Sequence, residues 1–167
     1  MLEVVDPGLL LTLQDRGRPG FAYLGIPPSG ACDAWGLAVA NLLVDAPLEG
    51  VAIEVTLGGV EILVVETCAV SLAGADLGAE RDDGRLLRPD ATHRLSSGSR
   101  LRFLGSARGA RAYLGMAGGI EAAKVLGSAA THVQSGLGGL DGRALRQGDR
   151  LLPVRRGDLS SLRRAWP

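Results

Sequence analysis

Polar side chains with catalytic potential are concentrated in one segment near the N-terminus, TLQDRGRPGFAYLGIPPSGACD, from Thr12 to Asp33. It sets carboxylates, guanidinium groups, an amide and a hydroxyl among glycines and prolines: Gln14, Asp15, Arg16, Arg18, Ser29 and Asp33. A guanidinium group binds a carboxylate or phosphate through paired hydrogen bonds, and a carboxylate can orient it or act as a base. We expect this segment to present polar groups at a pocket.

The segment is predicted to be an ordered loop. A connection of about twenty residues without clear periodicity is usually either functional or disordered. Phe21, Tyr23 and Leu24 supply apolar groups to bury, which argues against disorder. Purely structural roles stay open for single residues, because Asp33 is also a good helix N-cap and Asp15 fits a solvated turn.

A second glycine-rich region, Leu126–Asp149, carries Ser128, Thr131 and His132. A Ser–His–Asp set can be assembled on paper from Ser128 or Ser29 with His132 and Asp15 or Asp33. Almost any chain offers such a set, and a catalytic triad is defined by geometry. No GxSxG nucleophile elbow occurs, so we do not adopt a triad. The only lysine, Lys124, is expected to be a surface residue.

Composition and motifs exclude several classes of function. Lys plus Arg and Asp plus Glu are equal at 18 each, so no net positive charge favours nucleic acid or a membrane surface. No GxxxxGK[ST] phosphate loop is present, and neither His93 nor His132 has zinc-site spacing to the cysteines. We expect no metal site. No long apolar run or basic leader is found, so we expect a cytoplasmic protein in which Cys32 and Cys68 are buried free thiols.

The periodicity predicts one mainly β domain, a barrel or sandwich, with a single convincing helix. That helix covers residues 34–44, follows Asp33 as N-cap, and is apolar nearly all round, as a buried helix is. Within it, Asn41 is expected to be a hydrogen-bonded core amide. Alternating residues 51–57 and 60–65 flank Gly58–Gly59 and predict a hairpin. Further strands are predicted at the ranges 2–5, 9–13, 69–73, 92–95, 100–104, 111–116 and 150–154, and a basic linker follows at 155–167.

Several stretches occur in an order that resembles one protein family. These are QDRGRPGFAYLGIPPSGACD (14–33), AN (40–41), LAGADL (72–77), GARAYLGMAGGI (109–120), VLGSAATH (125–132) and GGLDGRALRQGDRL (138–151). The family is the biotin-dependent carboxyltransferases, also called allophanate hydrolase subunit 2. It includes the C subunit of bacterial 5-oxoprolinase, the Kip-system antagonist and the carboxyltransferase region of urea carboxylase. The chain departs from the family pattern at Cys32, where methionine is usual, and at Asp45–Ala46, where Gly-Asn is usual.

The resemblance implies a cyclophilin-like β-barrel. Family members are about twice as long, and their SDRMGYR-like and QVPPDG-like segments are absent here. We therefore expect residues 1–154 to correspond to the N-terminal half of the family's domain, with 155–167 as a linker to the other half, and we expect this half alone to be inactive.

The resemblance also implies an activity: a subunit of a bacterial, ATP-dependent hydrolase complex that opens the lactam of 5-oxoproline. Its partners would be subunits of the B type (Kip-inhibitor-like) and of the lactam-utilisation A type, and no cofactor would be bound by this chain alone. Biotin-dependent carboxyl transfer to urea or a related amide, with carboxybiotin, is one alternative. A non-enzymatic Kip-type regulatory binding protein is another.

Site roles follow from that chemistry, because an amide carbonyl needs oriented donors and a base. We expect the catalytic residues to be Asp15, Arg18 and Arg111, with the arginines holding a carboxylate or phosphate. The residues expected to bind substrate are Gln14, Arg16, Ser29, Asp33, Gly118, Gly119, Ser128, Thr131 and His132, with backbone amides at Gly118 and Gly119 facing a developing oxyanion.

Overall fold

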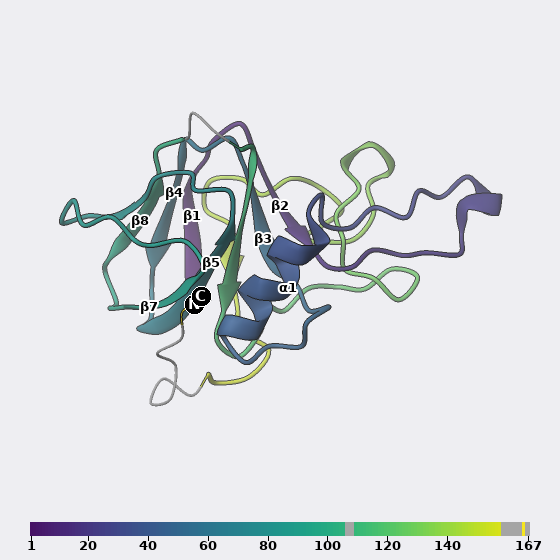
Figure 1. Cartoon of the computed structure of the whole chain (residues 1–167). Helices are drawn as coiled ribbons and strands as arrows, with labels where there is room; N and C mark the ends of the chain where they lie inside the picture. Colours follow the sequence, from purple (N-terminus) through teal and green to yellow (C-terminus); the bar gives the residue numbers. More distant parts are fainter. Residues whose placement is uncertain (106–108, 158–164, 166–167) are drawn as a thin grey trace.

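The computed structural model describes residues 1–105, 109–157 and 165, and shows two antiparallel five-stranded sheets with one helix outside them (Figure 1). The first sheet has the order β10 (Arg150–Leu151), β1 (Leu2–Pro7), β4 (Val60–Val64), β8 (Arg100–Phe103), β6 (Ala79–Arg81). The second has the order β2 (Leu10–Gln14), β3 (Ala52–Thr56), β9 (Arg111–Met116), β5 (Cys68–Gly74), β7 (Ala91–Leu95). The mainly β class is confirmed, although these strands stay in two sheets and do not close into one hydrogen-bonded cylinder within the described residues.

Consecutive strands lie in different sheets, except for β2 and β3, which are neighbours in the second sheet. The hairpin predicted across Gly58–Gly59 is wrong: β3 pairs with β2 and β9, whereas β4 pairs with β1 and β8. Strands β1 and β2 divide between the sheets in the same way, as do β8 and β9. The chain bends between β1 and β2 and again between β3 and β4, so that β1 pairs with β4 in one sheet while β2 pairs with β3 in the other.

Glycines make these bends possible because the backbones of neighbouring segments touch one another there. A Cβ on Gly8 would lie 2.5 Å from the carbonyl oxygen of Gly58, and a Cβ on Gly58 would lie 2.6 Å from the amide nitrogen of Gly105. Gly58 also has a φ of +107°, a region that side-chain-bearing residues rarely adopt. The glycine pair that suggested a hairpin is a corner between two sheets.

The main core fills the space between the two sheets, and a second, smaller core lies under the helix. The main core includes Leu2, Leu13, Ile53, Ile62 and Phe103, each at most 2% exposed. Strands β3, β5 and β9 are buried on both faces, because the helix α1 (Ala34–Leu43) covers the outer face of their sheet. Because of this double burial, side chains that point to opposite faces of β3, such as those of Ala52 and Ile53, are both fully buried.

The predicted helix is confirmed, one residue shorter at its C-terminal end. Asp33 is its N-cap, and one oxygen of its carboxylate accepts from the amides of Trp35 and Gly36, each at 3.0 Å. Asn41 is fully buried, and its side-chain amide donates to the carbonyl oxygens of Leu48 and Gly50. That amide ties the loop after the helix to the helix itself.

Other expectations were met only in part. Cys68 is buried, but Cys32 is exposed, because it lies just before the N-terminus of α1 and not in a strand. The last strand spans Arg150–Leu151 only, and most of the predicted linker, residues 158–164 and 166–167, lies outside the described residues. In the described part of the chain, no helix has the length and apolar character needed to cross a bilayer.

Candidate functional site

The glycine- and proline-rich segment forms an arm that leaves β2, projects from the body and returns to α1 (Figure 1). The two sides of its base are joined by bonds from the Arg18 amide to the Pro28 carbonyl oxygen, at 2.7 Å, and from the Ala31 amide to the Asp15 carbonyl oxygen, at 2.9 Å. Gly30 permits this approach, since a Cβ there would lie 2.7 Å from the carbonyl oxygen of Arg16. The base of the arm is therefore ordered, as the sequence predicted.

The Asp15 carboxylate fastens the arm to the second glycine-rich region. One oxygen accepts from the Gly17 amide at 2.7 Å and from the Ser128 hydroxyl at 2.6 Å. The other accepts from the Ala129 amide at 2.6 Å, and Asp15 is only 5% exposed. Two segments more than a hundred residues apart thus share one buried carboxylate.

The Arg18 guanidinium makes a second bridge between the same segments. It is 1% exposed and donates to the carbonyl oxygens of Val125, at 3.3 Å, and Ala130, and to the hydroxyl of Ser29 at 3.1 Å. These bonds use three of the five N–H groups of the guanidinium, and with 1% exposure Arg18 is placed to hold the two loops together. Asp15, with three donors, is held in the same way.

Gln14 and Thr131 extend this contact along the edge of β2. The Gln14 amide donates to the Thr131 carbonyl oxygen at 3.2 Å, and the Thr131 hydroxyl donates to the carbonyl oxygen of Leu13 at 2.9 Å. Both side chains are at least 94% buried. The sequence-predicted residues Gln14, Asp15, Arg18, Ser128 and Thr131 therefore lie together, in one buried polar network.

Arg111 and Asp33 belong to another group, around a carboxylate that the sequence analysis missed. Glu54, on β3, is 6% exposed and accepts from the Tyr113 hydroxyl at 2.7 Å and the Cys32 amide at 2.8 Å. The Asp33 amide donates to the Tyr113 oxygen at 2.7 Å, and Arg111 Nε lies 3.6 Å from Glu54. Burial, followed by the bond to Glu54, raises the pKa of the Tyr113 phenol above its usual value. The sequence held one sign of this group: Glu54 is the only charged residue in the strand-like segment 51–57.

The Gly118–Gly119 turn follows β9, and its two amides differ. The Gly119 amide donates to the Met116 carbonyl oxygen at 2.9 Å, which closes the turn. No acceptor for the Gly118 amide is found among the described residues. Of these two amides, the one of Gly118 has no acceptor among the residues that the structure describes, and Gly118 is fixed by contact, since a Cβ there would lie 2.0 Å from the Arg155 carbonyl oxygen.

A cleft beside the buried network brings together the arm base, the Gly118–Gly119 turn and the loop after α1. It consists of two adjoining cavities, of about 460 and 500 Å³, which share lining residues that include Asp15, Glu49 and Lys124. We call these two cavities the central cleft. The first also touches Gly118 and Gly119, and the second touches Arg16, which forms an exposed ion pair with Glu49. Lys124 is exposed, as expected, but it stands on the wall of both cavities.

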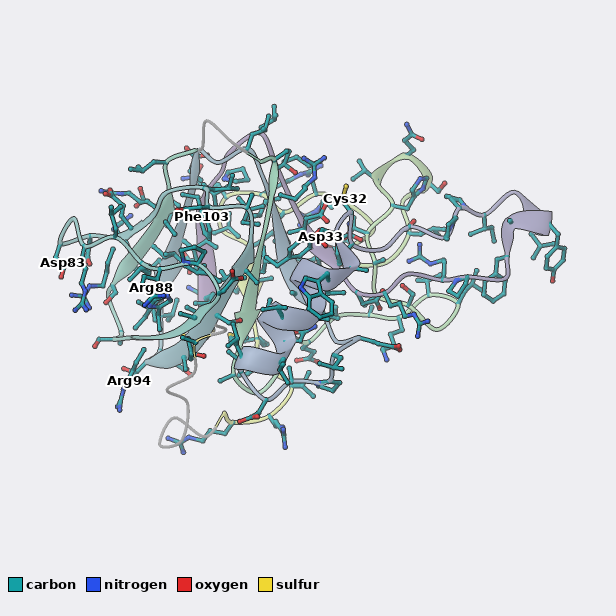
Figure 2. The ribbon with its side chains drawn as sticks, in the orientation of Figure 1. Cys32, Asp33, Asp83, Arg88, Arg94 and Phe103 are labelled. Atoms are coloured by element: carbon teal, nitrogen blue, oxygen red, sulfur yellow. The ribbon has the colours of Figure 1, made fainter. Side chains whose placement is uncertain are left out.

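Two predicted binding residues lie away from the central cleft. His132 is the N-cap of the short 3-10 helix η2 (Val133–Ser135), and its ring nitrogen accepts from the Ser135 amide at 3.3 Å. Asp33 marks the N-terminus of α1, on the side of the molecule from which the arm extends (Figure 2). Neither lines the cavities that Asp15 lines. The structure thus brings Asp15, Arg16, Gly118 and Gly119 to one cleft. The other predicted binding residues do not line it: Asp33 and His132 lie elsewhere, and the polar network beside the cleft contains Gln14, Ser29, Ser128 and Thr131.

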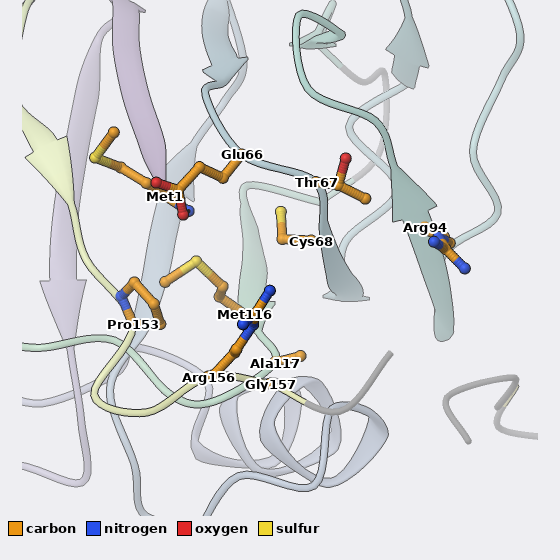
Figure 3. Close-up of a pocket in the computed structure, with 10 residues that line it drawn as sticks. All are labelled: Met1, Glu66, Thr67, Cys68, Arg94, Met116, Ala117, Pro153, Arg156 and Gly157. Carbon is orange, nitrogen blue, oxygen red and sulfur yellow. The ribbon is translucent and has the colours of Figure 1, made fainter. Parts of the chain in front are cut away.

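A separate cavity of about 460 Å³ lies between the sheets' ends and the start of the chain (Figure 3). Met1, Cys68 and Met116 give it a sulfur-rich wall, and Arg94 and Arg156 also line it. Burial raises the pKa of the Cys68 thiol. None of the predicted site residues lines this cavity. Within residues 1–105, 109–157 and 165, no cluster of three or more His, Cys, Asp or Glu side chains could hold a metal ion.

Comparison with known proteins places these features in a family. Residues 24–164 match the model described as "Carboxyltransferase domain, subdomain A and B". The chain is 38% identical over 151 residues to the C subunit of Escherichia coli 5-oxoprolinase, covering 90% of this chain and 48% of that protein. It is 36% identical over 149 residues to urea amidolyase of Saccharomyces cerevisiae, covering 89% of this chain and 8% of that protein.

The fold is shared with solved structures. The crystal structure of Kluyveromyces lactis urea carboxylase matches with a TM-score of 0.87 at 29% identity, covering 98% of this chain and 14% of that chain. Two sheets and one outer helix are thus common to both proteins over nearly all of this chain. The chain spans about half the length of the 5-oxoprolinase subunits that it matches.

Proposed function

The chain belongs to the family of carboxyltransferase domains with subdomains A and B, and from this we propose that it serves in an ATP-dependent complex of the 5-oxoprolinase type. In the proposed reaction, the amide C–N bond of a lactam breaks while water adds its hydroxyl to the carbonyl carbon and its hydrogen to the nitrogen. ATP hydrolysis, on companion subunits, drives the step. The observation that carries the proposal is the 38% identity to the C subunit of 5-oxoprolinase over 90% of the chain.

The central cleft supplies groups that suit a lactam bearing a carboxylate. The Gly118 amide, which has no acceptor in the described part of the chain, is a donor for the lactam oxygen, where negative charge develops during attack on the carbonyl. Lys124 offers an ammonium group to the substrate carboxylate, and no hydrogen-bond acceptor for it is found in the described part of the chain. Asp15 and Arg18 would act indirectly, because their hydrogen bonds fasten residues 125–130, which follow Lys124 in the chain, to the base of the arm.

The experiment uses the chain tagged in its native cells and purified with its companion proteins. Glutamate release from 5-oxoproline is measured with and without ATP. Lys124→Gln should raise KM for 5-oxoproline about tenfold or more, because a charge-assisted hydrogen bond contributes about 1.5–3 kcal/mol. Arg94→Gln, a similar loss of an exposed cation far from the cleft, is the control and should leave KM unchanged. No ATP-dependent glutamate release from the wild-type complex would refute the proposal.

Carboxyl transfer to urea is the second candidate function, because relatives named urea amidolyase are 36% and 35% identical to this chain. The same purified complex is assayed for transfer of labelled bicarbonate to urea, with streptavidin detection of a biotinylated companion. Labelled product together with a biotinylated band would favour this function over lactam opening. A stable complex with neither activity would instead support the regulatory binding role.

A further inference from the structure

The tip of the arm exposes apolar side chains that contact little of the body. Tyr23 is 80% exposed and Leu24 is 59% exposed, although the sequence analysis expected both to be buried. They lie on the short 3-10 helix η1 (Ala22–Leu24), which has no buried residue. A Cβ added at Gly20 or Gly25, on either side of η1, would meet no atom within 4 Å. The tip therefore stands in open space (Figure 1).

The tip is presented on a rigid support. Its own turn is closed by bonds from the Leu24 amide to the Phe21 carbonyl oxygen, at 3.0 Å, and from the Gly25 amide to the Ala22 carbonyl oxygen, at 2.9 Å. The base is fixed by the buried side chains of Asp15 and Arg18. An ordered arm loses little conformational entropy on binding, which favours a role in recognition.

The chemistry of the tip restricts the kind of partner that can bind it. Residues 19–32 contain no charged side chain, so the tip suits an apolar protein surface and not a nucleic acid or a charged peptide. Exposed aromatic residues of this kind are frequent anchors of protein interfaces. A second copy of this chain is a poor fit, because both the central cleft and the cavity of Figure 3 carry charged side chains.

We propose that the arm tip, centred on Tyr23 and Leu24, docks into an apolar groove on a companion domain equivalent to the half of the carboxyltransferase relatives that this chain does not match. Those relatives are about twice as long: the chain covers 48% of the C subunit of 5-oxoprolinase from Escherichia coli and from Haemophilus influenzae. Docking at the tip would place the companion domain beside the central cleft, because the arm base lines that cleft. The inference depends on the family and not on which amide is the substrate.

Photo-cross-linking in the native complex tests this assignment. Tyr23→p-benzoylphenylalanine is incorporated in native cells, and cross-linked peptides are identified by mass spectrometry. We expect peptides that align with the unmatched half of the 5-oxoprolinase relatives, on the same or on a separate polypeptide. Peptides from residues 1–167 of a second copy, peptides from any other protein, or no cross-link would overturn the proposal. Leu86→p-benzoylphenylalanine is the control, since Leu86 is 68% exposed. In the sequence it lies between Asp83 and Arg88, which Figure 2 shows on the side of the molecule away from the arm.

A matched pair of substitutions gives a second measurement. Tyr23→Asp should weaken the association with the companion domain at least tenfold, whereas Leu86→Asp should leave it unchanged. Association is read as co-purified companion, or, if both lie on one polypeptide, as the rate of protease cleavage between the halves. Equal effects of the two variants would overturn the proposal. Activity measured on the same preparations separates a failure of docking from an error in the assigned substrate.

Discussion

Asn in place of Asp15 should destabilise the protein strongly, although the two side chains have nearly the same shape. The carboxylate accepts three hydrogen bonds, from the Gly17 and Ala129 amides and the Ser128 hydroxyl. In either orientation of the Asn amide, its NH2 group faces a backbone N–H. The loss of a charged bond costs about 1.5–3 kcal/mol and a stranded buried donor about 1–3 kcal/mol, so we expect roughly 3–5 kcal/mol.

A chain of this size loses about 2–4 °C in Tm for each kcal/mol, so Asp15→Asn should lower Tm by about 10 °C. Thermal unfolding followed by circular dichroism measures this, with urea unfolding as a second estimate. Asp33→Asn is the matched control. Asp33 also accepts two backbone amides, but it is exposed and serves as an N-cap, a position where Asn is equally good.

The comparison of the two variants decides the role of Asp15. A Tm change below about 3 °C for Asp15→Asn, or equal changes for Asp15→Asn and Asp33→Asn, would contradict the view that Asp15 fastens the arm. The result would then favour Asp15 as a residue free to act on substrate.

Three further predictions concern thiols, backbone space and pH. Iodoacetamide should alkylate the exposed Cys32 rapidly at pH 8 and Cys68 slowly, because burial raises the pKa of the Cys68 thiol; peptide mass spectrometry measures both. Gly138→Ala should lower Tm much more than Gly127→Ala. Both glycines have a positive φ, which costs a side-chain-bearing residue about 1–2 kcal/mol. A Cβ at Gly138 would in addition lie 2.1 Å from the Ala130 carbonyl oxygen, whereas a Cβ at Gly127 would meet no atom within 4 Å. The hydrogen bond from Arg143 lowers the pKa of the Asp149 carboxyl group. The ionised carboxylate therefore stabilises the fold at any pH above its unfolded pKa, and this stabilisation is lost as the pH falls through the folded pKa. Asp149→Asn should lower Tm at pH 7, and the difference in Tm between the variant and the wild type should shrink below pH of about 4.

The positions of the secondary-structure elements could be predicted because their signals are local. The helix of residues 34–44 follows from an Asp N-cap and an apolar run, and strands such as β3 and β4 follow from alternation. The partners of those strands could not be predicted. A glycine pair is compatible with a hairpin turn and with a corner, and only the contacts between Gly8, Gly58 and Gly105 distinguish the two.

The candidate site was predicted as a set of residues and not as an arrangement. Asp15, Arg18 and Ser128 were selected by residue type, but the hydrogen bonds that they make, between Ser128 and Asp15 and from Arg18 to Val125, join segments far apart in the sequence. The sequence could not show that Asp15 and Arg18 would be almost fully buried, each with three hydrogen bonds inside the protein. Glu54 was overlooked because it sits in an apolar strand, where its partners come from the residues before α1 and from β9.

The link between Asp15 and Ser128 also bears on the order in which the protein assembles. The two residues are 113 positions apart, and the bond from Arg18 to Ala130 spans 112. During synthesis the chain emerges N-terminus first, so neither of these two bonds can hold the arm until the region around residue 130 has left the ribosome. Until then the uncharged tip is exposed at the end of an arm whose base lacks these two contacts. This is the period in which a nascent chain would most need a chaperone.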